Sequence, residues 1–502
     1  MVFSSIIFLF LFLPITLLVY HLLFLPVSLK HKAATIWRHL ANLFLLSSSL
    51  IFYFWGEVWL VWIILASTFI DFFCGLMISG AFHKGRIEKL EKNQPRTTLQ
   101  KTGLLISLVS NLAFLFFFKY FNFGVDSFNA LAPEAWRLHD VIRVTLPLGI
   151  SFYTFQSMSY TIDVYRGHVK ATRNIIDFSA FVTLFPQLVA GPIVRYQTIA
   201  DQLVHRTITL ASFSSGVQRF ILGLAKKVLI ANTVARTADW VFSLSEDQLT
   251  TPLAWAGILC YTLQIYFDFS GYSDMAIGLG RMLGFNFLEN FNYPYISRSI
   301  QEFWSRWHIS LSTWFRDYLY IPLGGNQRGN TRTYINLLLV FFLCGLWHGA
   351  SWTFVVWGLY HGLFLIIERA GFKKTLNRIP SVFSHVYTLL VVMGGWVFFA
   401  CDDFGQSLYF FRTLAGLNHA VTAVYYQEYF CLDVQIAIVW GIFFSTPLLQ
   451  LISYGNQKAI DKIGAISHVT ALLQVVGLFS LLVFSAMFLS SGTFNPFIYF
   501  RF

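Results

Sequence analysis

Charge is the scarcest property of this 502-residue chain. Only 12% of its residues are charged, whereas 56% are hydrophobic and 19% are aromatic. A typical soluble domain carries about 25% charged residues. Half that density cannot cover a globular surface, so lipid must replace water over most of the exterior. The composition therefore excludes an ordinary soluble protein.

Cysteine is sparse too. The five cysteines are scattered over the chain, at positions 74, 260, 344, 401 and 431, without the spacing of a metal site or a disulfide framework. The sequence also has no GxxxxGK[ST] phosphate loop, no GxSxG nucleophile elbow and no HExxH motif. These absences argue against an ATP-driven pump, a serine hydrolase and a zinc protease. We predict no bound metal and no resident cofactor.

Long apolar runs are abundant. A membrane-spanning helix needs about 20 mainly apolar residues. Runs near that length lie at 3–25, 41–55, 58–80, 103–121, 144–162, 253–269, 334–347, 352–367, 386–400, 436–452 and 469–489. The first should be retained as a span, because no basic residues precede it and no small-residue cleavage site follows it. We predict an all-α polytopic membrane protein, with roughly 10–12 transmembrane helices plus re-entrant and interfacial helices around a central funnel.

The net charge of +11 does not indicate nucleic-acid binding. The basic residues lie in short loops between apolar runs, as the positive-inside rule predicts for a membrane protein. The clusters within 30–38, 84–101, 166–173 and 369–378 should face the cytoplasm, in contact with lipid headgroups. The connectors 125–140 and 402–433 are poorer in Lys and Arg and should face outward.

The central part of the chain, from Phe181 to Gly349, has broken apolar runs. Proline and glycine interrupt them at Ala190-Gly191-Pro192 and Tyr293-Pro294-Tyr295, among other places. Non-helical backbone at membrane depth is tolerated only where protein or a water-filled cavity covers it. We therefore expect a cavity here, with functional ionisable residues beside it.

Residues Gln301–Tyr320 are predicted to form one amphipathic interfacial helix. Aromatic and apolar residues, including Trp304, Trp307 and His308, recur at three- and four-residue steps, with Arg306 on the opposite face. A single histidine in such a stripe is commonly a packed, hydrogen-bonded core residue. A catalytic role for His308 is the alternative.

His348 ends the apolar run that begins at Phe341 and follows Trp347 directly. Histidine is the one side chain whose unperturbed pKa lies near neutral pH. The imidazole either caps the free carbonyls of a helix end or acts as a general base at membrane depth. The local sequence leaves both interpretations open.

Two carboxylates lie in the apolar segment YFDFSGYSDMAIGLG. Asp268 and Asp274 need partners there, because a buried charge without one is costly, and Tyr272 and Ser273 can supply hydrogen bonds. The simpler interpretation is a polar lock between helices. Support of a bound substrate is the alternative.

Five stretches of the sequence carry a family resemblance. They are LPLGISFYTFQSMSYTIDVYRG (146–167), FPQLVAGPIVRY (185–196), QIYFDFSGYSDMAIGLGRMLGFNFLENFNYPY (264–295), FWSRWHISLSTWFRDYLYIPLGG (303–325) and LWHGASWTFVVWGLYHG (346–362). Together they resemble the membrane-bound O-acyltransferase family, in the branch that contains alginate O-acetyltransferase. The resemblance implies one membrane-embedded acyltransferase domain over 1–502. We divide it into N-terminal spans (1–145), a catalytic core (146–370) and C-terminal spans (371–502).

The resemblance also implies a chemistry. Members of this family move an acyl group from an activated thioester to a hydroxyl, and in this branch the acceptor is a cell-surface polysaccharide. The donor is then acetyl-CoA or another acyl thioester that enters from the cytoplasm. Arg306 or Arg316 would bind its phosphates, because guanidinium pairs well with phosphate. The protein is expected in a bacterial cytoplasmic membrane.

The family's hallmark histidine, in its WHG motif, falls on His348, and the companion in RWHIS falls on His308. His348 is expected to be the general base that takes the proton of the acceptor hydroxyl. His308 would orient the substrate, stabilise the developing oxyanion or relay the proton. A covalent acyl-histidine is the alternative mechanism.

Two other functions stay open. The teichoic-acid D-alanyl transferases are a sibling branch, but they are usually shorter, whereas this chain continues from His348 to Phe502. A transporter or flippase would use both histidines as proton-relay residues. Because the sequence shows no soluble domain, we expect a separate extracytoplasmic acyltransferase partner to hand the acyl group to the polymer.

Overall fold

The computed structural model describes residues 1–84, 87, 89–91, 94–418, 420, 422, 424–448, 466–492 and 495–496. All regular structure in these ranges is helical, which confirms the predicted all-α class. Six helical runs there are long and apolar enough to cross a membrane, at 8–28, 34–78, 98–131, 352–376, 381–400 and 469–490. The protein is therefore a polytopic membrane protein. Arg86 and Lys92 of the predicted basic loop, and the end of the predicted 436–452 span, lie outside the described residues.

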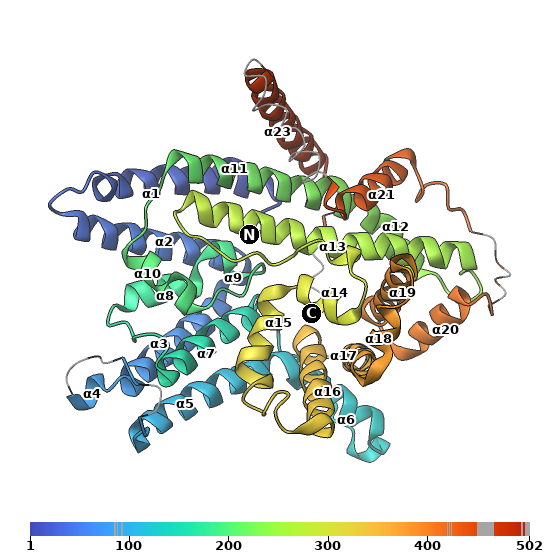
Figure 1. The fold of residues 1–502 in the computed structure, drawn as a ribbon, viewed down its shortest axis with the longest axis horizontal. Helices are drawn as coiled ribbons and strands as arrows, with labels where there is room; N and C mark the ends of the chain where they lie inside the picture. The colour runs from blue at the N-terminus through green and yellow to red at the C-terminus, as the bar shows by residue number, and fades with distance from the viewer. Residues whose placement is uncertain are drawn as a thin grey trace. The chain divides into compact units, whose positions relative to one another are not determined.

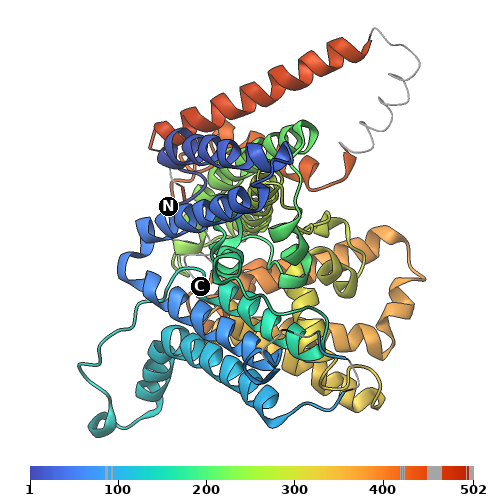
Figure 2. The same cartoon turned by 90° about the vertical axis from the view of Figure 1, so that its left-hand side faces the viewer.

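The chain divides into two compact units, and the first comprises Met1–Val217 and Ala276–Leu288. Its helices are α1 (Leu13–Ser28), α2 (Ala34–Glu57), α3 (Val61–Ile78), α4 (Ala81–Lys84), α5 (Thr98–Leu115), α6 (Phe121–Leu131), α7 (Ile150–Arg166), α8 (Ile175–Thr183), α9 (Phe185–Leu188) and α10 (Tyr196–Val204). Helix α3 packs against α5 and α7, and α2 packs against α1 and α8 (Figure 2).

Buried polar contacts fasten the helices of the first unit. The carboxylate of Asp71 on α3 accepts hydrogen bonds from Ser107 and Asn111 on α5, at 2.6 Å and 2.8 Å. In lipid, such contacts and close van der Waals packing hold helices together, because apolar side chains gain little by leaving lipid for protein. These contacts therefore join α3 to α5.

The second unit comprises Gln218–Met275 and Glu289–Phe502. Its helices are α12 (Asn232–Ser243), α14 (Ile300–Arg306), α15 (Ile309–Phe315), α16 (Gly329–His348), α17 (Trp352–Ile367), α18 (Lys373–Leu376), α19 (Ser381–Ala400), α20 (Phe404–Leu414), α21 (Leu432–Phe444) and α23 (Ile466–Ser490). Two helices, α11 (Leu210–Ala225) and α13 (Thr251–Met282), carry residues of both units (Figure 1).

Three predicted apolar segments, 144–162, 253–269 and 334–347, coincide with α7, α13 and α16. These helices are not among the six candidate spans. The expectation of ten to twelve spans therefore stays a prediction.

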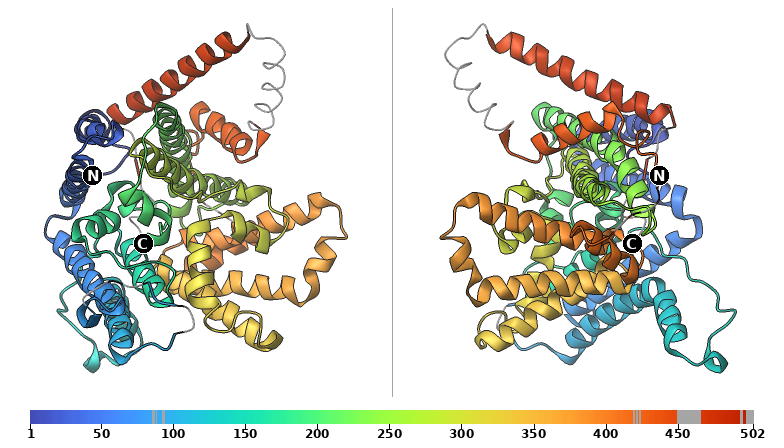
Figure 3. Two further views of the ribbon diagram at one scale, coloured as in Figure 1. Left: turned by 60° about the vertical axis from the view of Figure 1, so that its left-hand side comes forward. Right: turned by 90° about the vertical axis from the view of Figure 1, so that its right-hand side faces the viewer.

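Helices α16 and α17 approach each other closely enough for backbone contact. A Cβ atom added at Gly358 would lie 2.2 Å from the carbonyl oxygen of Phe341, and one at Gly345 would lie 2.3 Å from that of Phe354. Figure 3 shows α16 and α17 as neighbours, with α19 beside α17. Glycine allows this approach because it has no side chain to separate the helices.

The predicted continuous helix over Gln301–Tyr320 is wrong. Helix α14 ends at Arg306 and α15 begins at Ile309. His308 lies between them with a left-handed backbone, at φ 43° and ψ 54°. The aromatic residues on both sides of the break keep the same three- and four-residue spacing, so periodicity alone cannot reveal it.

Candidate active site

Two buried histidines meet in the second unit. His308 lies in the break between α14 and α15, and His348 is the last residue of α16. Their ring centroids are 6.4 Å apart. His308 is 0% exposed and His348 is 4% exposed. The fold thus brings together, in a water-poor interior, the two histidines that the sequence singled out.

Aromatic rings surround the pair. His348 lies edge-on to Trp357 of α17 at 5.0 Å and against Phe399 of α19 at 5.4 Å. His308 lies edge-on to Phe269 of α13 at 4.6 Å and against Trp347 at 5.9 Å. Four helices therefore contribute to one apolar enclosure, and His348 stands at its end because the close α16–α17 packing holds it there.

Asn290 connects His308 to two neighbouring segments. Its side-chain oxygen lies 3.2 Å from His308 Nδ1 and accepts hydrogen bonds from the backbone N–H and the hydroxyl of Ser310, at 3.2 Å and 2.8 Å. Its side-chain nitrogen donates to Ser273 Oγ at 3.1 Å. The predicted residue Ser273 is thus joined to His308 through one asparagine.

Burial determines the protonation state of His308. Burial lowers the pKa of its imidazole to about 3, because water no longer solvates the charged form. His308 is therefore neutral at physiological pH. A neutral imidazole can exchange protons with a substrate without first losing one to solvent.

A hollow of about 950 Å³ lies near the two histidines, although neither histidine is part of its wall. Its wall includes Cys344, one helical turn before His348, and Ile309, which follows His308. Trp304 also lines the hollow and contacts Trp357, the ring that covers His348. The hollow therefore runs along residues that adjoin both imidazoles.

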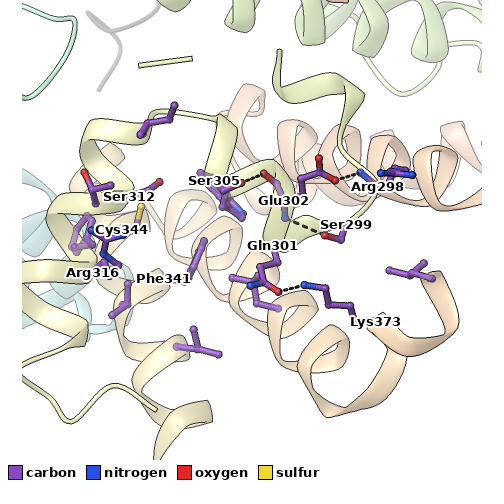
Figure 4. Close-up of a pocket in the computed structure, with 18 of the residues that line it drawn as sticks. Arg298, Ser299, Gln301, Glu302, Ser305, Ser312, Arg316, Phe341, Cys344 and Lys373 are labelled. Atoms are coloured by element: carbon purple, nitrogen blue, oxygen red, sulfur yellow. Dashed lines mark hydrogen bonds between the residues drawn. The ribbon is translucent and has the colours of Figure 1, made fainter. Parts of the chain in front are cut away.

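Basic side chains line the same hollow. Figure 4 shows Arg298 and Lys373 at one side, and Arg316 at the other side together with Cys344. Lys373 donates a hydrogen bond to Gln301 at 2.6 Å. A smaller hollow of about 510 Å³ shares Gln301 and Lys373 with the first and adds further cations, namely Arg369 and Lys374. Cations beside an apolar wall suit a ligand with an anionic end and an apolar or weakly polar arm.

The two arginines predicted to bind phosphate differ in position. Arg316 lines the hollow, although its guanidinium is also paired with Asp317 at 2.7 Å. Arg306 lies outside the lining and is paired with Glu302 at 3.0 Å. The geometry therefore favours Arg316 over Arg306 as a ligand for an anionic substrate.

The other predicted residues hold the enclosure together. Asp268 is paired with Lys227 at 2.6 Å, and both side chains are almost fully buried. Asp274 is paired with Arg219 at 2.7 Å and with Lys226 at 2.6 Å. These ion pairs fit the polar-lock interpretation of the acidic segment.

The remaining predicted aromatic residues are core. Tyr272 is 2% exposed on α13. Trp307 packs against Trp396 at 5.0 Å and Phe291 at 5.1 Å. Neither touches the hollow, so we assign both to packing.

Sequence reasoning missed Asn290, His361 and Lys373. His361 shares the His-Gly dipeptide with His348, is fully buried, and lies edge-on to Trp304 at 5.1 Å. Asn290 lies in the stretch 264–295 that carries the resemblance, but no spacing distinguishes it from the neighbouring polar residues. From the sequence, Lys373 was interpreted only as part of the basic cluster within 369–378 that should face the cytoplasm.

The chain is similar to one protein-family model and to several known proteins. The family model described as MBOAT, membrane-bound O-acyltransferase family, matches residues 47–401. The "Probable alginate O-acetylase" of Azotobacter vinelandii is 43% identical, with 100% of each chain covered. The "Peptidoglycan O-acetyltransferase" of Helicobacter pylori is 33% identical over 83% of this chain and 80% of its own. The "Teichoic acid D-alanyltransferase" of Streptococcus thermophilus is 30% identical over 46% of this chain and 59% of its own.

Proposed function

Because the chain belongs to the membrane-bound O-acyltransferase family, we propose that it moves an acetyl group from a cytoplasmic thioester for the O-acetylation of alginate or a closely related polysaccharide. Full-length similarity to an alginate O-acetylase supports this acceptor over teichoic acid, because the D-alanyl transferase matches less than half of the chain. Family membership argues against the transporter alternative. The bacterial relatives support a bacterial cytoplasmic membrane as the location.

The observation that carries the proposal is the pair of buried imidazoles beside a cation-lined hollow. Acyl transfer breaks the O–H bond of the acceptor and the C–S bond of the thioester, and forms an ester C–O bond and a thiol S–H bond. The hydroxyl is a poor nucleophile until a base takes its proton. We assign this step to His348, with His308 as its companion.

The separation of the rings suits this chemistry. With ring centroids 6.4 Å apart, both imidazoles can lie around one bound acceptor group. Burial of both rings also keeps water away from the activated acyl group, which limits wasteful hydrolysis.

We assign the donor to the 950 Å³ hollow. The phosphates of a donor such as acetyl-CoA would pair with Arg298 and Lys373 at one side of the hollow, and its acyl arm would extend to the other side, where Cys344 and Arg316 lie. From there the thioester carbon is one helical turn from His348.

The direct test supplies labelled acetyl-CoA and polymer to the purified protein. The proposal expects loss of thioester that depends on the protein, whereas a transporter leaves the thioester intact. Lys373→Gln and Arg298→Gln should each raise the KM for the donor several-fold and leave kcat nearly unchanged, because binding common to ground and transition states is lost. Arg378→Gln is the matched control, since this exposed arginine lines neither hollow. An unchanged donor KM in both test variants would contradict the donor assignment.

A further inference from the structure

Asn290 caps the N-terminal end of α15 through two acceptor atoms, its backbone carbonyl oxygen and its side-chain oxygen. Its backbone carbonyl accepts from the N–H of Ile309 at 2.9 Å, and its side-chain oxygen accepts from the N–H of Ser310 at 3.2 Å. The first N–H groups of a helix have no partner within the helix and need an outside acceptor. Asn290 supplies it from a distant loop, because His308 precedes α15 in a left-handed conformation and makes no side-chain cap.

These contacts fix the orientation of the Asn290 amide. A backbone N–H can only donate, so the side-chain atom that faces Ser310 N must be the oxygen. The amide nitrogen then faces Ser273 Oγ, which can accept. The reversed amide would set two donors against each other at Ser310. The backbone N–H of Ser310 therefore fixes which side-chain atom of Asn290 is the oxygen.

The orientation of Asn290 in turn fixes the tautomer of His308. The Asn290 oxygen lies 3.2 Å from His308 Nδ1 and can only accept, so Nδ1 must carry a proton. The hydroxyl of Ser310 does not compete, because its single proton goes to the same oxygen at 2.8 Å, whereas it lies 3.5 Å from Nδ1. A neutral imidazole has only one N–H proton, so Nε2 carries the lone pair.

We propose that Asn290 is a positioning residue for acyl transfer, and that it holds His308 as the Nδ1–H tautomer so that His308 serves as a proton acceptor through Nε2. The inference rests on the proposed function. It excludes one of the three roles that were open for His308, the stabilisation of an oxyanion. A neutral ring with its only proton directed at Asn290 cannot donate a hydrogen bond to an oxyanion from Nε2. Nε2 of His308 can therefore only accept a proton or a hydrogen bond.

The proton balance of the reaction allows this role. The proton that leaves the acceptor hydroxyl ends on the thiolate when the C–S bond breaks. Between these two points one imidazole at a time holds it: His348 takes it from the hydroxyl as base, and Nε2 of His308 is the second site that can accept it. His308 stays neutral before substrate arrives, because burial holds the pKa of its imidazole near 3.

The charged groups near this site are already neutralised. Asp268 is paired with Lys227. Asp274, which follows Ser273, and Glu289, which precedes Asn290, balance the charges of Arg219 and Lys226. His348 is the titratable ring that faces His308 from α16. A carboxylate placed at position 290 would therefore act on His308 as a new charge in a neutral enclosure.

The tautomer can be observed without measuring activity. In protein labelled with ring-¹⁵N histidine, the His308 signals are those that disappear in His308→Gln. We expect a protonated Nδ1 and an unprotonated Nε2 in the unaltered protein, and loss of that preference in Asn290→Leu. An Nε2–H tautomer in the unaltered protein would overturn the proposal, even if the enzyme proves to be an acetyltransferase.

Kinetic measurements distinguish a positioning role of Asn290 from a purely structural one. Asn290→Leu should lower kcat about a hundredfold with little change in the donor KM, because a wrong tautomer disables proton transfer and not binding. Asn290→Asp keeps the acceptor oxygen and should retain activity at high pH. Its charge raises the pKa of His308, so activity should fall as the pH drops through that raised value.

The control is Asn336→Leu. Asn336 is a buried asparagine on α16 that donates to the backbone carbonyls of Leu323 and Gly325, at 3.5 Å and 3.2 Å. It should lower stability and leave the turnover and pH profile of the folded fraction unchanged. If Asn290→Leu and Asn336→Leu behave alike, or if Asn290→Asp shows no new acid limb, Asn290 is only a helix cap and the proposal fails.

Discussion

At the scale of single residues, burial sets the pH response of His308. Burial lowers the pKa of His308 to about 3, whereas a histidine in an unfolded chain titrates near 6.5. Between these values the unfolded chain binds a proton that the folded protein does not, so the stability contributed by neutral His308 is lost as the pH falls from about 6.5 toward 3.

We therefore predict that His308→Gln flattens the acid dependence of stability. The measurement is the thermal unfolding midpoint in detergent between about pH 7.5 and 5. The unaltered protein should lose more stability over this range than His308→Gln. His205→Gln is the control, because His205 is exposed, and it should follow the unaltered protein. Equal slopes for all three proteins would show that His308 is not held neutral.

The Lys227–Asp268 pair gives a second prediction at this scale. Both side chains are almost fully buried, 2.6 Å apart. Asp268→Asn leaves the buried ammonium of Lys227 without its carboxylate partner. The variant should lower the free energy of unfolding by about 3–5 kcal/mol. The double variant Lys227→Met/Asp268→Leu removes both charges and should recover most of that loss.

Chemical or thermal unfolding in detergent checks the pair, with turnover per folded molecule measured in parallel. If the Lys227–Asp268 pair is structural, the single variant should lose stability while its folded fraction keeps its turnover. The opposite result, unchanged stability with lost turnover, would place Asp268 in substrate binding instead.

At the scale of elements, the contact between α16 and α17 positions His348. Gly358 faces the carbonyl of Phe341 with no room for a Cβ atom, which would lie 2.2 Å away. Gly358→Ala must push the helices apart and should cost about 1–3 kcal/mol, the usual range for overpacking. The displaced end of α16 carries His348, so kcat should fall as well.

Gly477→Ala on α23 is the matched control, because no described atom lies within 4 Å of a Cβ added there. Unfolding midpoints and turnover of the two variants give the comparison. Gly358→Ala with unaltered stability and turnover would mean that the helices adjust freely and that their spacing does not position His348.

The elements also show what the sequence can and cannot predict. The apolar runs predicted the helices α3, α17 and α19 well, because a spanning helix needs a long apolar stretch whatever its neighbours are. The break at His308 escaped prediction. It depends on Asn290, a residue from another loop that caps α15, and such a long-range contact leaves no periodic signal.

The same distinction holds for the site. The pairing of His308 with His348 was anticipated from the family resemblance, because each histidine lies in a specific motif. The partners of Asp268 and Asp274 were not identified. Lys227, Arg219 and Lys226 lie on a preceding segment, and no spacing in the sequence links them to these carboxylates.

At the scale of the whole molecule, the described residues are helical and membrane-type, with no folded soluble domain among them. We predict that polymer acetylation needs a second, extracytoplasmic protein that takes the acyl group from this one. The protein reconstituted in vesicles with donor inside and polymer outside should acetylate little polymer. Addition of a periplasmic extract from a polymer-producing strain should restore transfer. Full acetylation by this chain alone would refute the prediction.

The central claim is that His348 is the base of a thioester-consuming acyl transfer. The most direct measurement compares acetyl-CoA consumption by the purified protein and its His348→Ala variant, with the thermal unfolding midpoint recorded for both. We predict a loss of roughly a hundredfold or more in the variant, at an unfolding midpoint that shows an intact fold. Near-normal consumption by a folded His348→Ala protein would remove His348 from the mechanism and contradict the account.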